Sequence, residues 1–492
     1  MYKPVIGFEI HVQLKTKSKL FGPAPMGQSD EPNVNIDEIV TGEPGVLPVL
    51  NKEAVHLGLR LGLALNCEIP EISKFDRKHY FYPDLPKGYQ ISQYDEPVCG
   101  KGHVDIEVNG QKKRIGITRA HLEEDAGKNV HPAGMNYSLI DLNRAGAPLL
   151  EIVTDPVLES SEEAQVFLTE LRNIIRYVGA SDADMEKGSM RVEPNISVRR
   201  PEEESLPKYK VEVKNINSIR FAKAAIDYEI TRQTEILEKG ETPKQVTMGW
   251  DEKNNRTVEQ RSKEDAADYR YFPDPDLPLL RFDRAMIESM RNSLPELPSQ
   301  KRVRFRNEYG LKDADIDSLI NYKELTFYFE EVVSELMEWQ DTDAESRMQD
   351  INKLVKAAAN WCLQDFMNLL KTEGVDPDDT KVTPENFAEL LILIEEGKVS
   401  GSAAKQVFKF MFEKGGEPDS IIHDLRLAQI SDTSAIEAAV RKVVAENPKA
   451  VADYKSGEQK SFGFLVGQSM KELKGQGNPQ VVNELLKKIL SE

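Results

Sequence analysis

The first residues of the chain that could do chemistry are Glu9 and His11, two positions apart near the N-terminus. Apolar residues occupy the alternate positions Ile6, Phe8 and Ile10, which is the period of a strand with one buried face. The carboxylate and the imidazole therefore share the other face, roughly 6–7 Å apart along the strand. At that spacing both can reach one divalent cation, although a solvated Glu/His pair on an edge strand has the same pattern.

A run of three acidic residues, Glu123-Glu124-Asp125, begins two positions after His121. Neighbouring carboxylates repel one another and destabilise a fold unless they are solvated or hold a cation. The triplet therefore indicates either an exposed acidic turn or a contribution to a metal site. The pattern does not choose among its three carboxylates.

A further carboxylate, Glu151, lies inside the apolar run Ala147–Val153. Carboxylates are rarely buried among apolar residues without a partner. Arg144 is close in sequence and is one candidate partner, and a metal ion is the other.

Two predicted strands carry alternating polar side chains. Arg191 and Asn195 alternate with apolar residues along Arg191–Val198, and Lys214 follows the strand predicted at Tyr209–Val213. Such faces are able to hold the phosphates of a nucleotide, and a solvated sheet surface gives the same pattern.

The chain lacks the short motifs of common nucleotide and hydrolase sites. It contains no G-x-x-x-x-G-K-[ST] phosphate loop, no dinucleotide glycine fingerprint and no G-x-S-x-G turn. Any use of ATP must therefore depend on a sheet surface with metal ligands and basic side chains. Cys67, Cys99 and Cys362 form no C-x-x-C pair, so we expect reduced structural thiols.

The elements that position these residues are short alternating strands in the first 290 residues. Clear examples are His103–Val108, Arg114–Thr118, Tyr137–Leu142, Arg191–Val198 and Tyr209–Val213. Helical spacing interrupts them at Glu53–Leu65, Ser161–Tyr177 and Ser218–Lys239. This density of strands predicts an α+β fold with a large mixed or antiparallel sheet, and not a regular βαβ array.

The pattern changes after the proline-dense segment Tyr271–Pro278. Residues 291–400 have helical periodicity, with the longest helix expected at Met348–Gly374, and residues 401–492 have shorter helical segments separated by glycine and proline. We therefore predict three domains: an α/β domain over 1–290, an all-helical domain over 291–400 and a small helical tail over 401–492.

Charge is unevenly distributed along the chain. The formal net charge of −19 argues against charge-driven nucleic-acid binding over the whole surface. Residues 401–492 are nearly neutral, with 13 Lys and Arg against 12 Asp and Glu, so the tail repels RNA least. No apolar run approaches the roughly 20 residues that cross a bilayer, and the N-terminus lacks a secretory signal, so we expect a cytoplasmic protein without membrane contact.

Several long motifs, in a fixed order, resemble one known family over essentially the whole length. They are Val5–Val12, Phe75–Asp84, His121–Lys128, Asp141–Arg144, Asp268–Pro273 and Gly463–Gln468. The chain resembles the B subunits of bacterial heterotrimeric aspartyl/glutamyl-tRNA amidotransferases. Several low-degeneracy motifs in one order are far more specific than any single short pattern.

The resemblance implies a cradle-like first domain, a helical domain and a flexible tail that grips tRNA. It also implies an ATP-dependent carbon–nitrogen ligase with glutamine as amido donor. With ATP and Mg²⁺ the protein would phosphorylate the side-chain carboxylate of Glu-tRNA(Gln) or Asp-tRNA(Asn), and ammonia would then give Gln-tRNA(Gln) or Asn-tRNA(Asn). The ammonia would come through a channel from the amidase (glutaminase) partner of the heterotrimer, and a small third partner would complete the assembly.

The resemblance also assigns residues. It implies that His11, Glu124 and Glu151 are the metal ligands, with Glu9 at a neighbouring metal or phosphate site. Hard oxygen ligands with one imidazole suit Mg²⁺ or Mn²⁺ better than structural zinc. Lys78 is similar to a channel-lining residue of the family, and the next residue departs from the family's usual asparagine, being His79.

Two other functions fit the same residues. The chain could be a tRNA-binding or assembly subunit without chemistry, its acidic residues forming a solvated face, or a zinc hydrolase built on His11. Release of ADP by the complex that is lost on mutation would exclude the first, and bound Mg²⁺ without zinc would exclude the second.

Deletion of residues 401–492 is expected to raise KM for aminoacyl-tRNA strongly in the assembled complex, because the nearly neutral tail is the segment that repels RNA least. Glutaminase activity measured without tRNA serves as the control and should stay near the wild-type rate. A filter-binding assay in which the truncated complex keeps its tRNA affinity would contradict this prediction.

Overall fold

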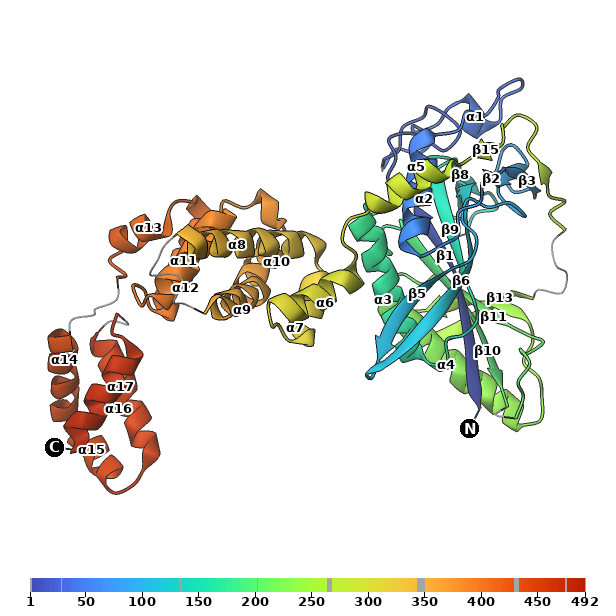
Figure 1. Ribbon diagram of the computed structural model, residues 1–492. Coiled ribbons are helices and arrows are strands. Elements are labelled where there is room, and N and C mark those ends of the chain that lie inside the picture. The colour runs from blue at the N-terminus through green and yellow to red at the C-terminus, as the bar shows by residue number, and fades with distance from the viewer. Residues whose placement is uncertain are drawn as a thin grey trace. The chain divides into compact units, whose positions relative to one another are not determined.

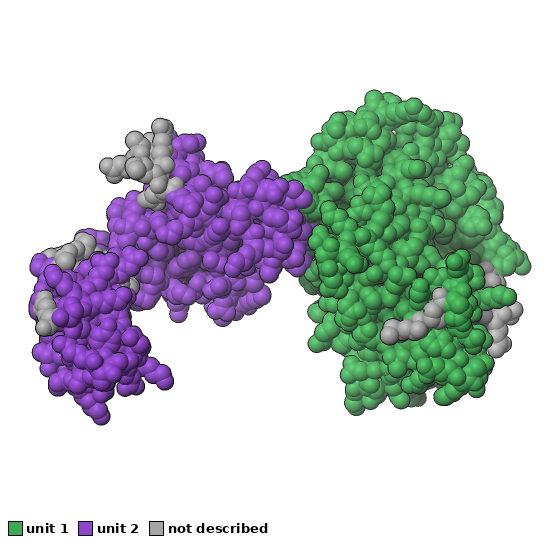
Figure 2. Space-filling view, turned by 60° about the horizontal axis from the view of Figure 1, so that its bottom comes forward, with its two compact units in different colours: residues 1–300 green, residues 301–492 purple. Residues whose placement is uncertain are grey.

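The computed structural model describes residues 2–27, 29–132, 134–200, 202–262, 268–342, 350–428, 433–473 and 476–491. Two compact units, Met1–Gln300 and Lys301–Glu492, make up the chain (Figures 1 and 2). The first unit holds the β-sheets and the second is helical (Figure 1). The division into three domains at 290 and 400 stays a prediction.

An eight-stranded sheet forms the centre of the first unit. Its strands, in spatial order, are β13 (Arg256–Ser262), β12 (Val246–Asp251), β11 (Val211–Lys214), β10 (Met190–Arg199), β1 (Lys3–Gln13), β9 (Pro148–Thr154), β6 (Gln111–Glu124) and β5 (Gly102–Val108). Strands β11 and β12 are parallel, and all the other neighbours are antiparallel. The predicted α+β class with a mixed sheet is confirmed.

One face of this sheet is apolar and covered by helices. Ile6, Phe8, Ile10 and Val12 of β1 alternate along the strand and are buried. Phe8 stacks on Phe167 of α3 (Ser161–Val178) with ring centroids 6.0 Å apart. Helix α3 also contacts β5, while α4 (Ile219–Glu238) contacts β10 and β13. Because side chains alternate along a strand, Glu9 and His11 project from the opposite face, as predicted.

The helices begin where the sequence signals predict. The Ser160 hydroxyl accepts a hydrogen bond from the backbone N–H of Glu163, 3.1 Å away, and so caps α3. Ser218 caps α4 in the same way through the N–H of Phe221. Helix α2 (Lys52–Ala64) packs on the same apolar face, since its Gly58 lies against Leu122 and Leu150.

A small three-stranded sheet lies next to the central one. It is formed by β14 (Phe272–Pro273), β3 (Asp76–His79) and β4 (Tyr89–Ser92), and β4 contacts β6. Two further pairs join β15 (Leu280–Arg281) to β2 (Ile72–Ser73) and β7 (Lys128–Val130) to β8 (Leu139–Asp141). Short helices α1 (Glu38–Thr41) and α5 (Arg284–Asn292) complete this unit.

The second unit is a succession of packed helices. They are α7 (Asp313–Ile320), α8 (Lys323–Thr342), α9 (Ile351–Trp361), α10 (Met367–Glu373), α11 (Pro384–Glu395), α12 (Gly401–Lys414) and α13 (Pro418–Asp424), preceded by α6 (Pro298–Glu308). A π-helical turn, Cys362–Phe366, joins α9 to α10, where the sequence predicted one uninterrupted helix.

The last four helices share an apolar core of their own. They are α14 (Thr433–Glu446), α15 (Pro448–Lys455), α16 (Gln459–Glu472) and α17 (Pro479–Ser491). Val482, Leu486 and Leu490 of α17 are buried in this core. Among the described residues, no helix is long and apolar enough to cross a membrane.

Phe167→Ala is expected to lower the free energy of unfolding of the first unit by about 3–5 kcal/mol, because it removes a fully buried ring from the contact with Phe8. Urea denaturation followed by tryptophan fluorescence measures the change. Gln165→Ala, at an exposed position of the same helix, is the control and should change the free energy by less than about 0.5 kcal/mol. An equal effect of the two substitutions would contradict the assigned packing.

Candidate metal centre

Strand register brings four polar residues into one row across the sheet. His11 of β1 lies opposite Glu151 of β9 on one side and Arg191 of β10 on the other. Glu151 in turn lies opposite His121 of β6. Residues from four strands, distant in sequence, therefore meet on the polar face.

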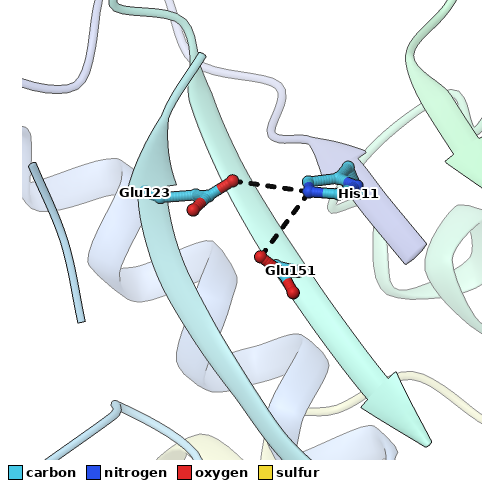
Figure 3. Close-up of side chains that lie close together, drawn as sticks. All are labelled: His11, Glu123 and Glu151. Atoms are coloured by element: carbon cyan, nitrogen blue, oxygen red, sulfur yellow. Dashed lines mark ion pairs between the residues drawn. The ribbon is translucent and has the colours of Figure 1, made fainter. Parts of the chain in front are cut away.

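His11 contacts two carboxylates in this region (Figure 3). Its Nε2 atom is 3.5 Å from Oε1 of Glu123 and 3.5 Å from Oε2 of Glu151. One ligand atom of each of these three residues lies within 4.8 Å of the other two. Donor atoms about 2.1 Å from a shared ion lie roughly 3.0–3.5 Å from their neighbours, so the three side chains fit a divalent cation with little movement.

Burial and opposite charge act against each other in this cluster. Burial alone lowers the pKa of His11, but the hydrogen bond to Glu151 and the charges of Glu151 and Glu123 raise it above its ordinary value. Burial alone raises the pKa of Glu151, but His121 and His11 bring it well below the ordinary value. The carboxylates are therefore held ionised, which is the state that binds a metal ion.

The structure places Glu124 apart from this cluster. Adjacent residues of a strand point to opposite faces, so Glu124 of β6 turns away from the face that carries Glu123. Its Oε1 atom pairs with the ammonium of Lys87 and accepts a hydrogen bond from the backbone N–H of Ile91 at 2.9 Å. In this geometry Glu123 completes the triad with His11 and Glu151, and the role of Glu124 as a ligand stays a prediction.

Glu9 belongs to a second cluster, one row further along β1. It lies opposite Glu193 of β10, and ligand atoms of Glu9, Glu193 and Glu212 lie within 4.8 Å of one another. The ammonium of Lys214 pairs with two of these carboxylates, 2.7 Å from Oε2 of Glu193 and 3.2 Å from Oε1 of Glu212. Asn195 donates a hydrogen bond of 3.1 Å to Oε1 of Glu9.

Comparison with known proteins agrees with this architecture. The family model of the "GatB/GatE catalytic domain" matches residues 4–288, and that of the "GatB domain" matches residues 345–490. The B subunit of the aspartyl/glutamyl-tRNA(Asn/Gln) amidotransferase from Caldicellulosiruptor saccharolyticus is 48% identical over 100% of this chain and 99% of its own length. The proteins of the same name from Dehalococcoides mccartyi and Persephonella marina are 47% and 46% identical, over 100% and 99% of this chain and 99% of each relative.

The chain belongs to the family of amidotransferase B subunits. The matched catalytic domain contains the central sheet and both carboxylate clusters. The family resemblance expected from the sequence motifs is therefore confirmed over the full length of the chain.

The three residues predicted to bind nucleotide in this amidotransferase chain all have carboxylate partners. The guanidinium of Arg191 donates two hydrogen bonds to the carboxylate of Asp125, of 2.7 and 3.1 Å. Lys214 and Asn195 are engaged with the second cluster as described above. They line one polar face of the sheet, so their positions agree with the prediction, whereas their contact with a nucleotide stays a prediction.

Lys78 of β3 reaches the same region of the first unit. Its ammonium lies 5.0 Å from the ring centroid of Tyr269. Burial alone lowers the pKa of Lys78, but the charges of Glu123, Tyr271 and Glu151 raise it above its ordinary value. The next residue, His79, faces away and stacks on Phe272, with the two ring centroids 5.1 Å apart.

Four residues of the two clusters were not assigned as ligands from the sequence: His121, Glu123, Glu193 and Glu212. For Glu123 a signal existed, because residues two apart on a strand share a face and Glu123 is two positions from His121. Glu193 and Glu212 lay in the strands already proposed for nucleotide binding. Only the pairing of β10 with β11 shows that the two carboxylates meet.

We expect the metal-free protein to lose stability between pH 6.5 and about 9. Burial lowers the pKa of His121, but Glu151 and Glu123 raise it to about 9, above the ordinary 6.5. A histidine whose pKa is raised by folding stabilises the folded state fully below pH 6.5. This contribution to the free energy of unfolding, here on the order of 2 kcal/mol, disappears as the pH rises through the pKa of the folded state. Urea denaturation in EDTA at the two ends of this range measures the loss.

The matched control for this pH dependence is Glu151→Gln, which keeps the side-chain shape and removes the charge. The pKa of Glu151 is lowered, so its own contribution to stability has the opposite pH dependence. That contribution is lost only as the pH falls below the ordinary 4.5, outside the range tested. The variant should therefore lose less stability than the wild type between pH 6.5 and 9. Equal losses would show that the imidazoles are not held by this carboxylate.

Proposed function

We propose that this chain is the catalytic subunit that activates a tRNA-bound carboxylate with ATP and Mg²⁺. The substrate would be the side chain of Glu-tRNA(Gln), of Asp-tRNA(Asn) or of both, and the products would be Gln-tRNA(Gln) and Asn-tRNA(Asn). The observation that carries the proposal is the triad of His11, Glu123 and Glu151 on a polar sheet face in a member of this family. The reaction makes the protein an ATP-dependent carbon–nitrogen ligase with glutamine as amido donor.

The chemistry explains why a nucleotide is needed. A carboxylate does not react with ammonia at neutral pH, so its oxygen must first attack the γ-phosphorus of ATP, with ADP as the leaving group. Ammonia then attacks the acyl carbon, and inorganic phosphate leaves. Such phosphoryl transfers depend on positioning and on compensation of the phosphate charges.

The triad offers two carboxylate oxygens and one imidazole nitrogen, which fits Mg²⁺ or Mn²⁺. A bound Mg²⁺ would neutralise part of the charge of the phosphates. His11, Glu123 and Glu151 would hold it, with Glu9 in the neighbouring cluster available to a second ion or to a phosphate-bound water.

Basic residues of the chain then act on the substrates directly. Arg191 and Lys214, on the face that holds the two clusters, are placed to bind nucleotide phosphates once they exchange their carboxylate partners. Lys78 would have an additional role, because the charge of Glu123 raises the pKa of its ammonium. The ammonium would compensate charge on the acyl phosphate or line the route of ammonia.

Other proteins would complete the reaction. The sequence shows no Ser/Lys amidase pattern and no Cys/His nucleophile pair, so ammonia would come from a separate amidase (glutaminase) partner. The heterotrimer would be completed by a small third partner. The nearly neutral helical tail supports contact with aminoacyl-tRNA, and the whole reaction would take place in the cytoplasm.

One observation favours a second candidate, a tRNA-binding or assembly subunit without chemistry. The carboxylates of both clusters already have protein cations beside them, His11 and His121 in one and Lys214 in the other. Charge compensation of this kind also occurs in purely structural networks. Tests on the ligands separate the two candidates.

Replacement of any ligand of the triad is expected to abolish tRNA-dependent ADP formation and amidation. Losing one ligand misplaces the phosphates, which commonly costs ~10²–10³ in rate. The variants His11→Ala, Glu123→Gln and Glu151→Gln should all show this loss in the assembled complex. ADP release and aminoacyl-tRNA formation are followed at several Mg²⁺ concentrations, and tRNA binding should be retained.

Glu124→Gln is the decisive companion variant. The geometry assigns the ligand role to Glu123, whereas the family resemblance assigned it to Glu124, so the comparison of Glu123→Gln with Glu124→Gln distinguishes the two. Glu107→Gln, at an exposed position of β5, is the control and should keep the wild-type rate. Wild-type turnover of His11→Ala and Glu151→Gln would favour the candidate without chemistry.

A further inference from the structure

We propose that His121 is a positioning residue that fixes Glu123 and Glu151 in the orientation required for metal binding. This inference rests on the proposed function, since it assumes that the triad holds a divalent cation. It gives a role to His121 of β6, a residue that takes no part in the reaction proposed above.

Both carboxylates of the triad lie between two imidazoles. His11 contacts them from β1, as described above. His121 contacts the same pair from β6, with its Nε2 atom 3.3 Å from Oε2 of Glu151 and 3.6 Å from Oε2 of Glu123. The two histidines therefore bracket the carboxylates, one from each side.

The burial of the two histidines differs. The side chain of His121 is 5% exposed, whereas that of His11 is 16% exposed. An ion that arrives from solvent therefore reaches the carboxylates more readily from the side of His11. The inner imidazole of His121 is placed to act as a support behind them.

His121 has few other polar contacts. Its Nδ1 atom is buried and has no hydrogen-bond partner among the described residues. The two carboxylates are the polar groups that its Nε2 atom contacts in the described part of the chain. Burying an imidazole in this way costs free energy unless the contact with the carboxylates offsets it.

The physical role follows from the repulsion between the two carboxylates. Their oxygens approach within 4.8 Å in a shielded environment, where like charges separate or one of them takes up a proton. The Nε2 atom of His121, fixed by the β-sheet, restrains both carboxylates in the position in which they also contact His11. Groups that orient metal ligands in this way commonly contribute 10–100-fold to metal affinity.

The test compares Mn²⁺ binding by the full chain without nucleotide, measured by electron paramagnetic resonance of the free ion. His121→Leu removes the donor at similar volume and should raise the Kd for Mn²⁺ about 10–100-fold. His121→Gln retains an N–H donor of similar reach and should restore most of the affinity. His56→Leu is the matched control on α2, where the imidazole is 42% exposed, and should leave the Kd unchanged.

Thermal melting of each variant verifies that it is folded. Should His121→Leu unfold, His121→Asn provides the same comparison, because its amide is too short to reach both carboxylates. Weaker Mn²⁺ binding by folded His121→Asn than by His121→Gln supports the positioning role. Equal Kd values for the wild type and for folded variants without the donor would overturn it.

A spectroscopic count of nitrogen ligands separates positioning from direct coordination. Electron spin-echo modulation of bound Mn²⁺ should detect one imidazole nitrogen, that of His11, and the signal should persist in His121→Gln. Two imidazole nitrogens in the wild type would overturn the positioning role. A wild-type chain that binds no Mn²⁺ would overturn the metal centre and this inference together, whereas normal binding that is insensitive to His121 would overturn only the latter.

Discussion

Side-chain alternation along β1 is the constraint on which the rest of this structure depends. The strand must bury Phe8 against the helices on one face, so it must present Glu9 and His11 on the other. A shift of register by one residue would place the imidazole in the apolar core and the phenyl ring on the polar face. The stability of the sheet and the position of the candidate metal centre are therefore determined by the same pairing of β1 with β9 and β10.

The polar face is stable because its charges are compensated in pairs. Asp125 pairs with Arg191, Glu193 with Lys214, and the carboxylates of the triad with imidazoles. Each of these groups would be costly to bury alone. A protein that is strongly acidic overall therefore carries local cations on this face, each beside a carboxylate.

Local sequence patterns predicted the α+β class, the positions of α3 and α4, and the common face of Glu9 and His11. They did not choose Glu123 over Glu124, because the face that Glu123 shares with His121 is identified only when β6 pairs with β9 and His121 lies opposite Glu151. The π-helical turn at Cys362–Phe366 was missed for a similar reason: Phe366 packs against Tyr328, Phe387 and Phe408 from other helices, and such contacts leave no trace in local periodicity. Pairing between distant segments is the information that local patterns lack.

The central position of β1 has a consequence for biosynthesis. Strand β1 pairs with Val153 and Glu193, which are made more than a hundred residues later. Until then its apolar face has no sheet to join, and contacts of such long sequence separation form slowly. The nascent chain must therefore carry an unpaired, aggregation-prone strand through the synthesis of most of the first unit.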